Sequence, residues 1–134
     1  IFVHAKLCDR WGYEQLHGKV RARSIDAMKD ADRLIGHILY LEAHPKVHRS
    51  TALTLGATVP EQLAFDLKSE QDLLRLLNEG VRHCNDVADF TTRHLLEGMA
   101  KQTDAHIDWI EIQLGTITQV GIERYLAKQI KPGR

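Results

Sequence analysis

A long run of helical periodicity from about Glu14 to Ala43 carries two apolar faces. On a helical wheel at about 100° per residue, the first face lies within about 40° of Ala27, and the second lies roughly 110° further round. The first face predicts packing in a bundle core, and the second predicts contact with a partner. The first comprises Val20, Ala31, Leu34, Ile38 and Leu41; the second comprises Ile25, Met28, Ile35 and Leu39.

The remaining pattern predicts four more helical segments and no strand. Gly12 ends the first segment, and the long run stops at His44-Pro45, because a residue before proline is pushed out of the helical conformation. Thr58, followed by an early proline and glutamate, starts the third segment. The segments are Ile1–Arg10, Glu14–Ala43, Thr58 to about Asp86, Val87 to about Thr118, and Gly121–Ile130, which Pro132-Gly133 closes off.

The connection between the second and third segments, from Lys46 to Thr58, is unusually long. Neighbouring antiparallel helices need only about 2 to 8 linking residues, so a longer link has room to cross a whole bundle. The sequence therefore predicts an all-α fold, an antiparallel four-helix bundle with a long crossover between helices two and three and a short C-terminal fifth helix. This is the ferritin-like arrangement.

Composition narrows the class of protein. The chain has 134 residues, of which 43% are apolar, so it predicts one soluble domain over residues 1–134. Eighteen basic residues balance eighteen acidic ones, which argues against nucleic acid or an anionic membrane as the main partner. Two cysteines cannot build a disulfide framework, so the cytoplasm is the expected compartment. The uncapped start at Ile1 predicts that a first part of helix one precedes this chain.

Two side chains of metal-ligand type fall in predicted core stripes. Glu70 lies in the middle of the stripe of the third helix, and His106 lies at the centre of that of the fourth. A buried carboxylate is costly unless it is paired or bound to a cation. A hydrogen-bonded Glu–His pair without a metal and a remnant metal site both remain open on these two residues alone.

Several short motifs, in order along almost the whole chain, resemble bacterioferritin. They are Trp11-Gly12, Ser24-Ile25-Asp26-x-Met28-Lys29-x-Ala31-Asp32, Ile38-Leu39-Tyr40-Leu41-Glu42, Asp66-Leu67, His106-Ile107-Asp108-Trp109 and Tyr125-Leu126-x-x-Gln129-Ile130. The resemblance implies haem b, one per subunit pair, with its iron held by one methionine thioether from each subunit. Met28 stands at that position.

The haem assignment agrees with the second apolar face, which contains Met28 and Ile25. A soft thioether on an apolar face suits haem iron, although spacing alone fits simple interface packing as well. Phe2, Ile25 and Lys29 are the further haem contacts that we expect. Lys29 and Arg21 flank the site and are candidates for the haem propionates, with plain surface solvation as the alternative.

The same resemblance exposes a defect in the expected di-iron ferroxidase centre. The Glu-x-x-His positions hold Ala27 and Asp30 on the second helix, and Thr103 and His106 on the fourth; the third-helix position keeps Glu70. Both bridging carboxylates are therefore missing. Because two close iron ions need several carboxylates for neutralisation, we expect no stable di-iron pair and at most one weakly bound ion at Glu70, His106 and Asp30.

Three functions remain as hypotheses. The first is a haem-binding iron-storage subunit of a cage with 24 copies, which passes electrons for iron release, while a ferroxidase-competent bacterioferritin subunit oxidises iron and a ferredoxin-type protein donates electrons. The second is a working ferroxidase, against which Ala27 and Thr103 argue. The third is a purely structural shell subunit that binds no haem.

Overall fold

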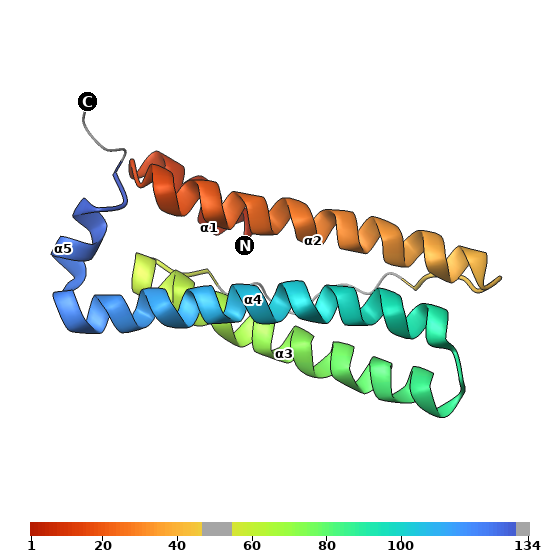
Figure 1. Ribbon diagram of the computed structural model, residues 1–134. Coiled ribbons are helices and arrows are strands. Elements are labelled where there is room, and N and C mark those ends of the chain that lie inside the picture. The colour runs from red at the N-terminus through yellow and green to blue at the C-terminus, as the bar shows by residue number, and fades with distance from the viewer. Residues whose placement is uncertain (47–54, 131–134) are drawn as a thin grey trace. The chain divides into compact units, whose positions relative to one another are not determined.

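The computed structural model describes residues 1–46 and 55–130 (Figure 1). Every regular element in these ranges is a helix, as the sequence predicts. The chain divides into two compact units. One holds α1, α2 and the described end of the chain from Leu126, and the other runs from Gly56 to Tyr125.

The first unit is a helical hairpin of α1 (Phe2–Arg10) and α2 (Glu14–Tyr40), which run antiparallel (Figure 1). Gly12 makes the turn with a φ of 85°, a left-handed conformation that glycine adopts without a steric penalty. The N–H groups of Gly12 and Tyr13 donate to the carbonyls of Asp9 and Cys8 at 3.0 and 2.9 Å. This is the Schellman motif, and it confirms the predicted break.

The core of this hairpin lies near its turn. Leu16 and Val20 of α2 are buried, as are Ala5 and Cys8 of α1. At 1.5 Å per residue the nine residues of α1 cover about 14 Å of an α2 that is about 40 Å long. Within this unit α1 therefore covers only the first part of α2. Of the residues predicted to face the core, Val20 is buried, and Leu34 and Ile38 are half-buried. The prediction is wrong for Ala31 and Leu41, which are exposed.

The end of α2 differs from the prediction. The helix ends at Tyr40 rather than at Ala43, because Glu42 takes a left-handed conformation with a φ of 62°. The N–H groups of Glu42 and Ala43 donate to the carbonyls of Leu39 and Ile38 at 3.0 and 3.1 Å, in a second Schellman motif. Pro45 thus lies beyond a helix that has already ended. The predicted crossover follows, and its residues 47–54 lie outside the described residues.

The second unit is built on the antiparallel pair of α3 (Val59–Asp86) and α4 (Phe90–Val120) (Figure 1). The start of α3 is as predicted, since the Thr58 hydroxyl accepts from the Glu61 N–H at 3.4 Å and Pro60 lies in the first turn. Gly56 packs so closely on Gln62 that an added Cβ would lie 2.3 Å from its backbone nitrogen. Only glycine fits there.

The turn between α3 and α4 corrects the predicted start of the fourth helix. Ala88 adopts a left-handed φ of 60° and ends α3, so α4 begins at Phe90 and not at Val87, and it continues to Val120. Asp89 caps α4 by accepting from the Thr92 N–H at 3.1 Å.

The short α5 (Ile122–Ala127) is shorter than the predicted segment, and Pro132-Gly133 lies outside the described residues. The Tyr125 hydroxyl bonds to Oε1 of Gln113 at 2.8 Å, which holds α5 against the end of α4. Within the described residues, no helix combines the length and apolar character needed to cross a membrane.

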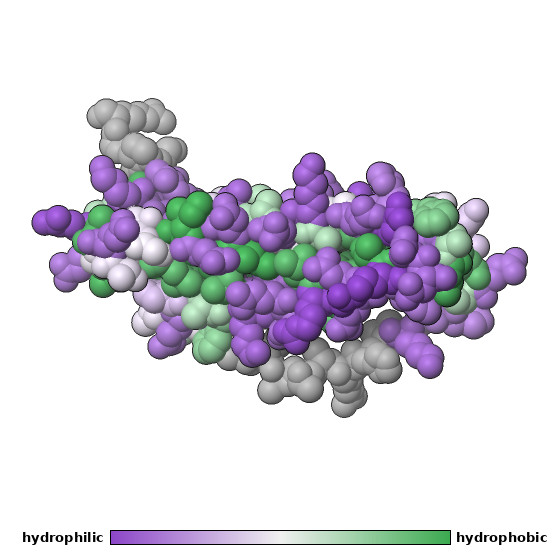
Figure 2. Space-filling view, turned by 60° about the horizontal axis from the view of Figure 1, so that its bottom comes forward, coloured by the Kyte–Doolittle hydropathy of each residue, from purple (hydrophilic) through white to green (hydrophobic). Residues whose placement is uncertain are grey.

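The α3–α4 pair buries much of its predicted stripes. Leu63 and Leu77 of α3 and Met99 and Ile110 of α4 are all at most 7% exposed. Other apolar side chains reach the surface of the molecule between hydrophilic ones (Figure 2). On α2, Met28, Ile35 and Leu39 of the second apolar face are exposed, and this face carries the first candidate site.

Candidate functional site

Met28 lies on the outside of the first unit. Its side chain is 54% exposed, and Ile35 and Leu39 of the same face are 46% and 55% exposed. Ile25 is half-buried. The helical wheel therefore assigns Met28 and Val20 to the correct faces of α2, because Val20 on the core face is only 3% exposed. A thioether is presented at the surface among aliphatic side chains.

The other expected haem contacts also reach the surface of the first unit. Phe2 of α1 is 45% exposed, with the Lys6 ammonium 5.7 Å from the centre of its ring. Lys29 is exposed on α2. An accessible sulfur with apolar neighbours is a donor set that fits haem iron, and an aromatic ring and cations suit the ring and carboxylates of a porphyrin. The contacts of Phe2, Ile25 and Lys29 with haem stay predictions.

The second candidate site starts from Glu70 and His106, which belong to the same unit. They lie on the paired helices α3 and α4 and are 3% and 5% exposed, so both are buried as predicted. The His106 ring stacks on Trp109, with ring centroids 5.4 Å apart and an angle of 22° between the planes. This pair offers one carboxylate and one imidazole.

The positions that would supply bridging carboxylates hold unsuitable groups. Ala27 has no donor atom. Thr103 is 1% exposed, and its hydroxyl donates to the Met99 carbonyl at 2.9 Å, so it is turned back onto its own helix. Asp30, where the resemblance implies a histidine, forms an ion pair with Arg33. These residues do not fit a dinuclear iron centre.

Across the two described stretches, the structure shows no group of three or more His, Cys, Asp and Glu residues that could hold a metal ion. Glu70 and His106 share the second unit, whereas Asp30 belongs to the first. The single weak ion at these three residues stays a prediction.

The sequence reasoning missed several buried polar residues. Arg23 is 5% exposed although it carries a charge, and Asp66 and Gln62 are 4% and 3% exposed. The signal for Arg23 was present, because it lies three residues after Val20 and four before Ala27, on the core face. Long polar side chains on an apolar face are easily assigned to the rim of that face instead.

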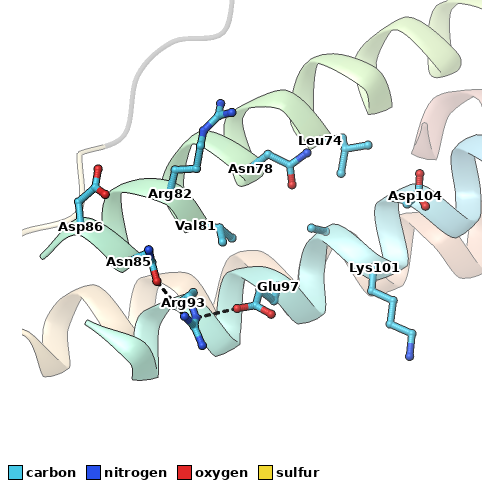
Figure 3. Close-up of a pocket in the computed structure, with 11 residues that line it drawn as sticks. Leu74, Asn78, Val81, Arg82, Asn85, Asp86, Arg93, Glu97, Lys101 and Asp104 are labelled. Carbon is cyan, nitrogen blue, oxygen red and sulfur yellow. Dashed lines mark hydrogen bonds and ion pairs between the residues drawn. The ribbon is translucent and has the colours of Figure 1, made fainter. Parts of the chain in front are cut away.

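A cleft of about 880 Å³ opens between the C-terminal half of α3 and the N-terminal half of α4 (Figure 3). Arg93 lines its α4 side, donating to Oδ1 of Asn85 at 3.0 Å and pairing with Glu97 at 2.9 Å. The three cations that line the cleft are balanced by three anions. They are Arg82, Arg93 and Lys101, with Asp86, Glu97 and Asp104. Arg93 therefore ties α3 to α4, and the cleft has no net charge to select a ligand.

Cys84, at the end of α3, is buried and has no disulfide partner. Burial, and secondarily the carboxylate of Asp89, raise the pKa of its thiol above the usual value. The residue stays protonated at neutral pH and packs as a small apolar group, so it adds no nucleophile or metal ligand.

Comparison with known proteins agrees with this architecture. Residues 1–120 match the ferritin-like domain. The chain is 36% identical over 127 residues to bacterioferritin BfrA of Mycobacterium tuberculosis, covering 95% of this chain and 80% of the relative. It is 34% identical to the bacterioferritin of Brucella melitensis (92% and 77% covered) and 35% to a bacterial ferritin of Pseudomonas aeruginosa (96% and 84% covered). The predicted fold class is thereby confirmed, and the chain belongs to the bacterioferritins of the ferritin-like family.

Proposed function

We propose that this chain is a haem-binding subunit of an iron-storage cage and that it passes electrons through haem for the release of stored iron. The observation that carries the proposal is the contrast between its two sites. Met28 is exposed on an apolar face. The positions expected to bind the ferroxidase irons hold instead Ala27 and Thr103, whose hydroxyl donates to the Met99 carbonyl of its own helix. Iron oxidation is assigned to a ferroxidase-competent partner subunit.

Met28 would hold the haem iron through its sulfur, together with the same residue of a second copy of the chain. The aliphatic neighbours Ile25, Ile35 and Leu39 exclude water from the porphyrin face, which favours burial of a largely apolar ring. Bound haem would supply a centre that accepts and donates single electrons. Two chains share one haem, so the functional unit is a subunit pair.

Iron is the cargo of the proposed assembly. An electron that reaches the ferric mineral reduces it, and ferrous iron is then free to leave. The electron donor outside the shell is expected to be a ferredoxin-type protein. The assembly is expected to contain 24 subunits and to lie in the cytoplasm, as the resemblance to bacterioferritin implies.

The remnant site makes a smaller contribution in this proposal. Glu70 and His106 supply one carboxylate and one imidazole, which suffice for one weakly held divalent ion at most. Rapid oxidation of ferrous iron by this chain alone is therefore not expected. A purely structural shell subunit would share that property but would bind no haem, which makes the haem spectrum decisive.

The chain offers a matched pair of variants for the test, because it has two methionines, Met28 and Met99. Met99 is 3% exposed in the core of α4, so Met99→Leu keeps any surface ligand intact. We expect the purified assembly to show the visible absorption of haem with two thioether ligands. Met28→Leu should abolish this spectrum, and Met99→Leu should retain it with a stability loss below about 1.5 kcal/mol.

Two results would contradict the proposal. Haem binding that survives Met28→Leu with an unchanged spectrum would remove Met28 as the ligand. A native cage that contains only this chain and still oxidises ferrous iron rapidly would remove the division of labour between subunits.

A further inference from the structure

Arg21 lies in the same row of α2 as Met28. The two residues are seven positions apart, which places them about 10.5 Å apart along the helix axis and about 20° apart around it. Ile35 continues the row seven residues further on. Arg21 is exposed, as are Met28 and Ile35. A cation, a thioether and an aliphatic side chain thus follow one another along the proposed haem face.

The guanidinium of Arg21 is available for a ligand. Its backbone carbonyl accepts from the Ser24 hydroxyl at 2.8 Å. The side chain itself has no hydrogen-bond or ion-pair partner in the part of the chain that the structure describes. Arg33 and Arg93, in contrast, are held by Asp30 and Glu97.

Lys29 is the other exposed cation beside Met28, but it lies in a different direction. It follows Met28 directly, so its side chain projects about 100° further round the helix. The sequence leaves Lys29 and Arg21 open as candidates for binding the haem propionates. The alignment of Arg21 with Met28 along α2 favours Arg21.

We propose that Arg21 binds a propionate carboxylate of the haem that Met28 ligates. This inference rests on the proposed function and names the group that orients the cofactor. A b-type haem carries two propionates, and a symmetric pair of chains supplies two copies of Arg21, one for each carboxylate. The planar fork of a guanidinium matches a carboxylate in a bidentate manner, which a lysine cannot reproduce.

The test compares haem with its propionate dimethyl ester, which has the same ring and iron but no carboxylate charges. Both are titrated into the purified chain and its variants, with binding followed by visible absorption. Arg21→Ala should weaken haem binding about tenfold and leave the ester unchanged. Lys19→Ala, the matched control, removes an exposed cation about 180° round α2 from Met28 and should change neither titration. Arg21→Lys should bind haem with intermediate affinity.

The outcomes separate this inference from the function on which it rests. Equal haem affinity in Arg21→Ala and the unaltered chain overturns the role of Arg21, while a Met28-dependent spectrum keeps the proposed function. Equal weakening of haem and ester also overturns it, because the arginine would then act on the ring or the fold. If the unaltered chain binds no haem through Met28, both proposals fail.

Discussion

At the scale of single residues, the proposed lack of ferroxidase activity rests on three side chains. Ala27, Asp30 and Thr103 stand where the resemblance to bacterioferritin implies ligands, and the hydroxyl of Thr103 already donates to the Met99 carbonyl. Loss of ligands is reversible in principle, because Glu70 and His106 remain buried on their two helices. The effect of a missing ligand on metal binding can therefore be tested by restoring that ligand.

The variant Thr103→Glu should gain metal binding, because it adds a carboxylate to the unit that holds the buried Glu70 and His106. Without metal, the added buried carboxylate should lower the free energy of unfolding by about 2–4 kcal/mol, because it lacks a partner. Zn²⁺ or Fe²⁺ should recover that loss, since an ion that binds only the folded state stabilises it. Thermal unfolding with and without Zn²⁺ measures both effects.

The control for this restoration is Ala105→Glu, which adds the same charge at an exposed position of α4. It should show neither the loss nor the recovery. If the unfolding temperature of Thr103→Glu does not change with Zn²⁺, the missing carboxylate at this position is not what prevents metal binding.

Much of the candidate site could be predicted at this scale. Periodicity alone placed Met28 outside the core and Glu70 and His106 inside it. The direction of the Thr103 hydroxyl could not be predicted, because it depends on a choice of rotamer that spacing does not reveal. The pairing of Asp30 with Arg33 is similar, since several acids and bases share that face of α2.

At the scale of elements, three helices end in the same way, with one residue in the left-handed conformation. Gly12 ends α1, Glu42 follows α2, and Ala88 follows α3. Only the first could be predicted, because glycine is the usual residue there. Glu42 and Ala88 are not residues that usually end a helix. The predicted end of α2 and the predicted start of α4 were therefore each wrong by three residues.

Ala88→Gly should stabilise the chain. A residue with a Cβ pays a steric cost at a φ of 60°, so glycine should raise the free energy of unfolding by about 0.5–1 kcal/mol. Ala105→Gly, the same substitution at an exposed position inside α4, should lower it by about 1 kcal/mol. Urea unfolding of both variants checks the prediction. Opposite signs are required, and a loss in both would contradict the role of Ala88.

At the scale of the whole molecule, the proposed function requires a pair of chains, because one haem takes a Met28 sulfur from each. Titration of haem into the purified chain should therefore saturate at one haem for every two chains. Quantitative haem extraction, combined with protein concentration and the mass of the assembly, measures this ratio. A plateau at one haem per chain would mean that a single chain supplies the whole site.

The hydrogen bond from the Thr103 hydroxyl to the Met99 carbonyl affects how the folded chain accumulates in a cell. A buried carboxylate at position 103 would make the stability of the α3–α4 pair depend on a bound cation. A hydroxyl that is satisfied within its own turn removes that dependence. We expect the shell component to accumulate equally well in iron-starved and iron-replete cells, ready before any mineral has been laid down.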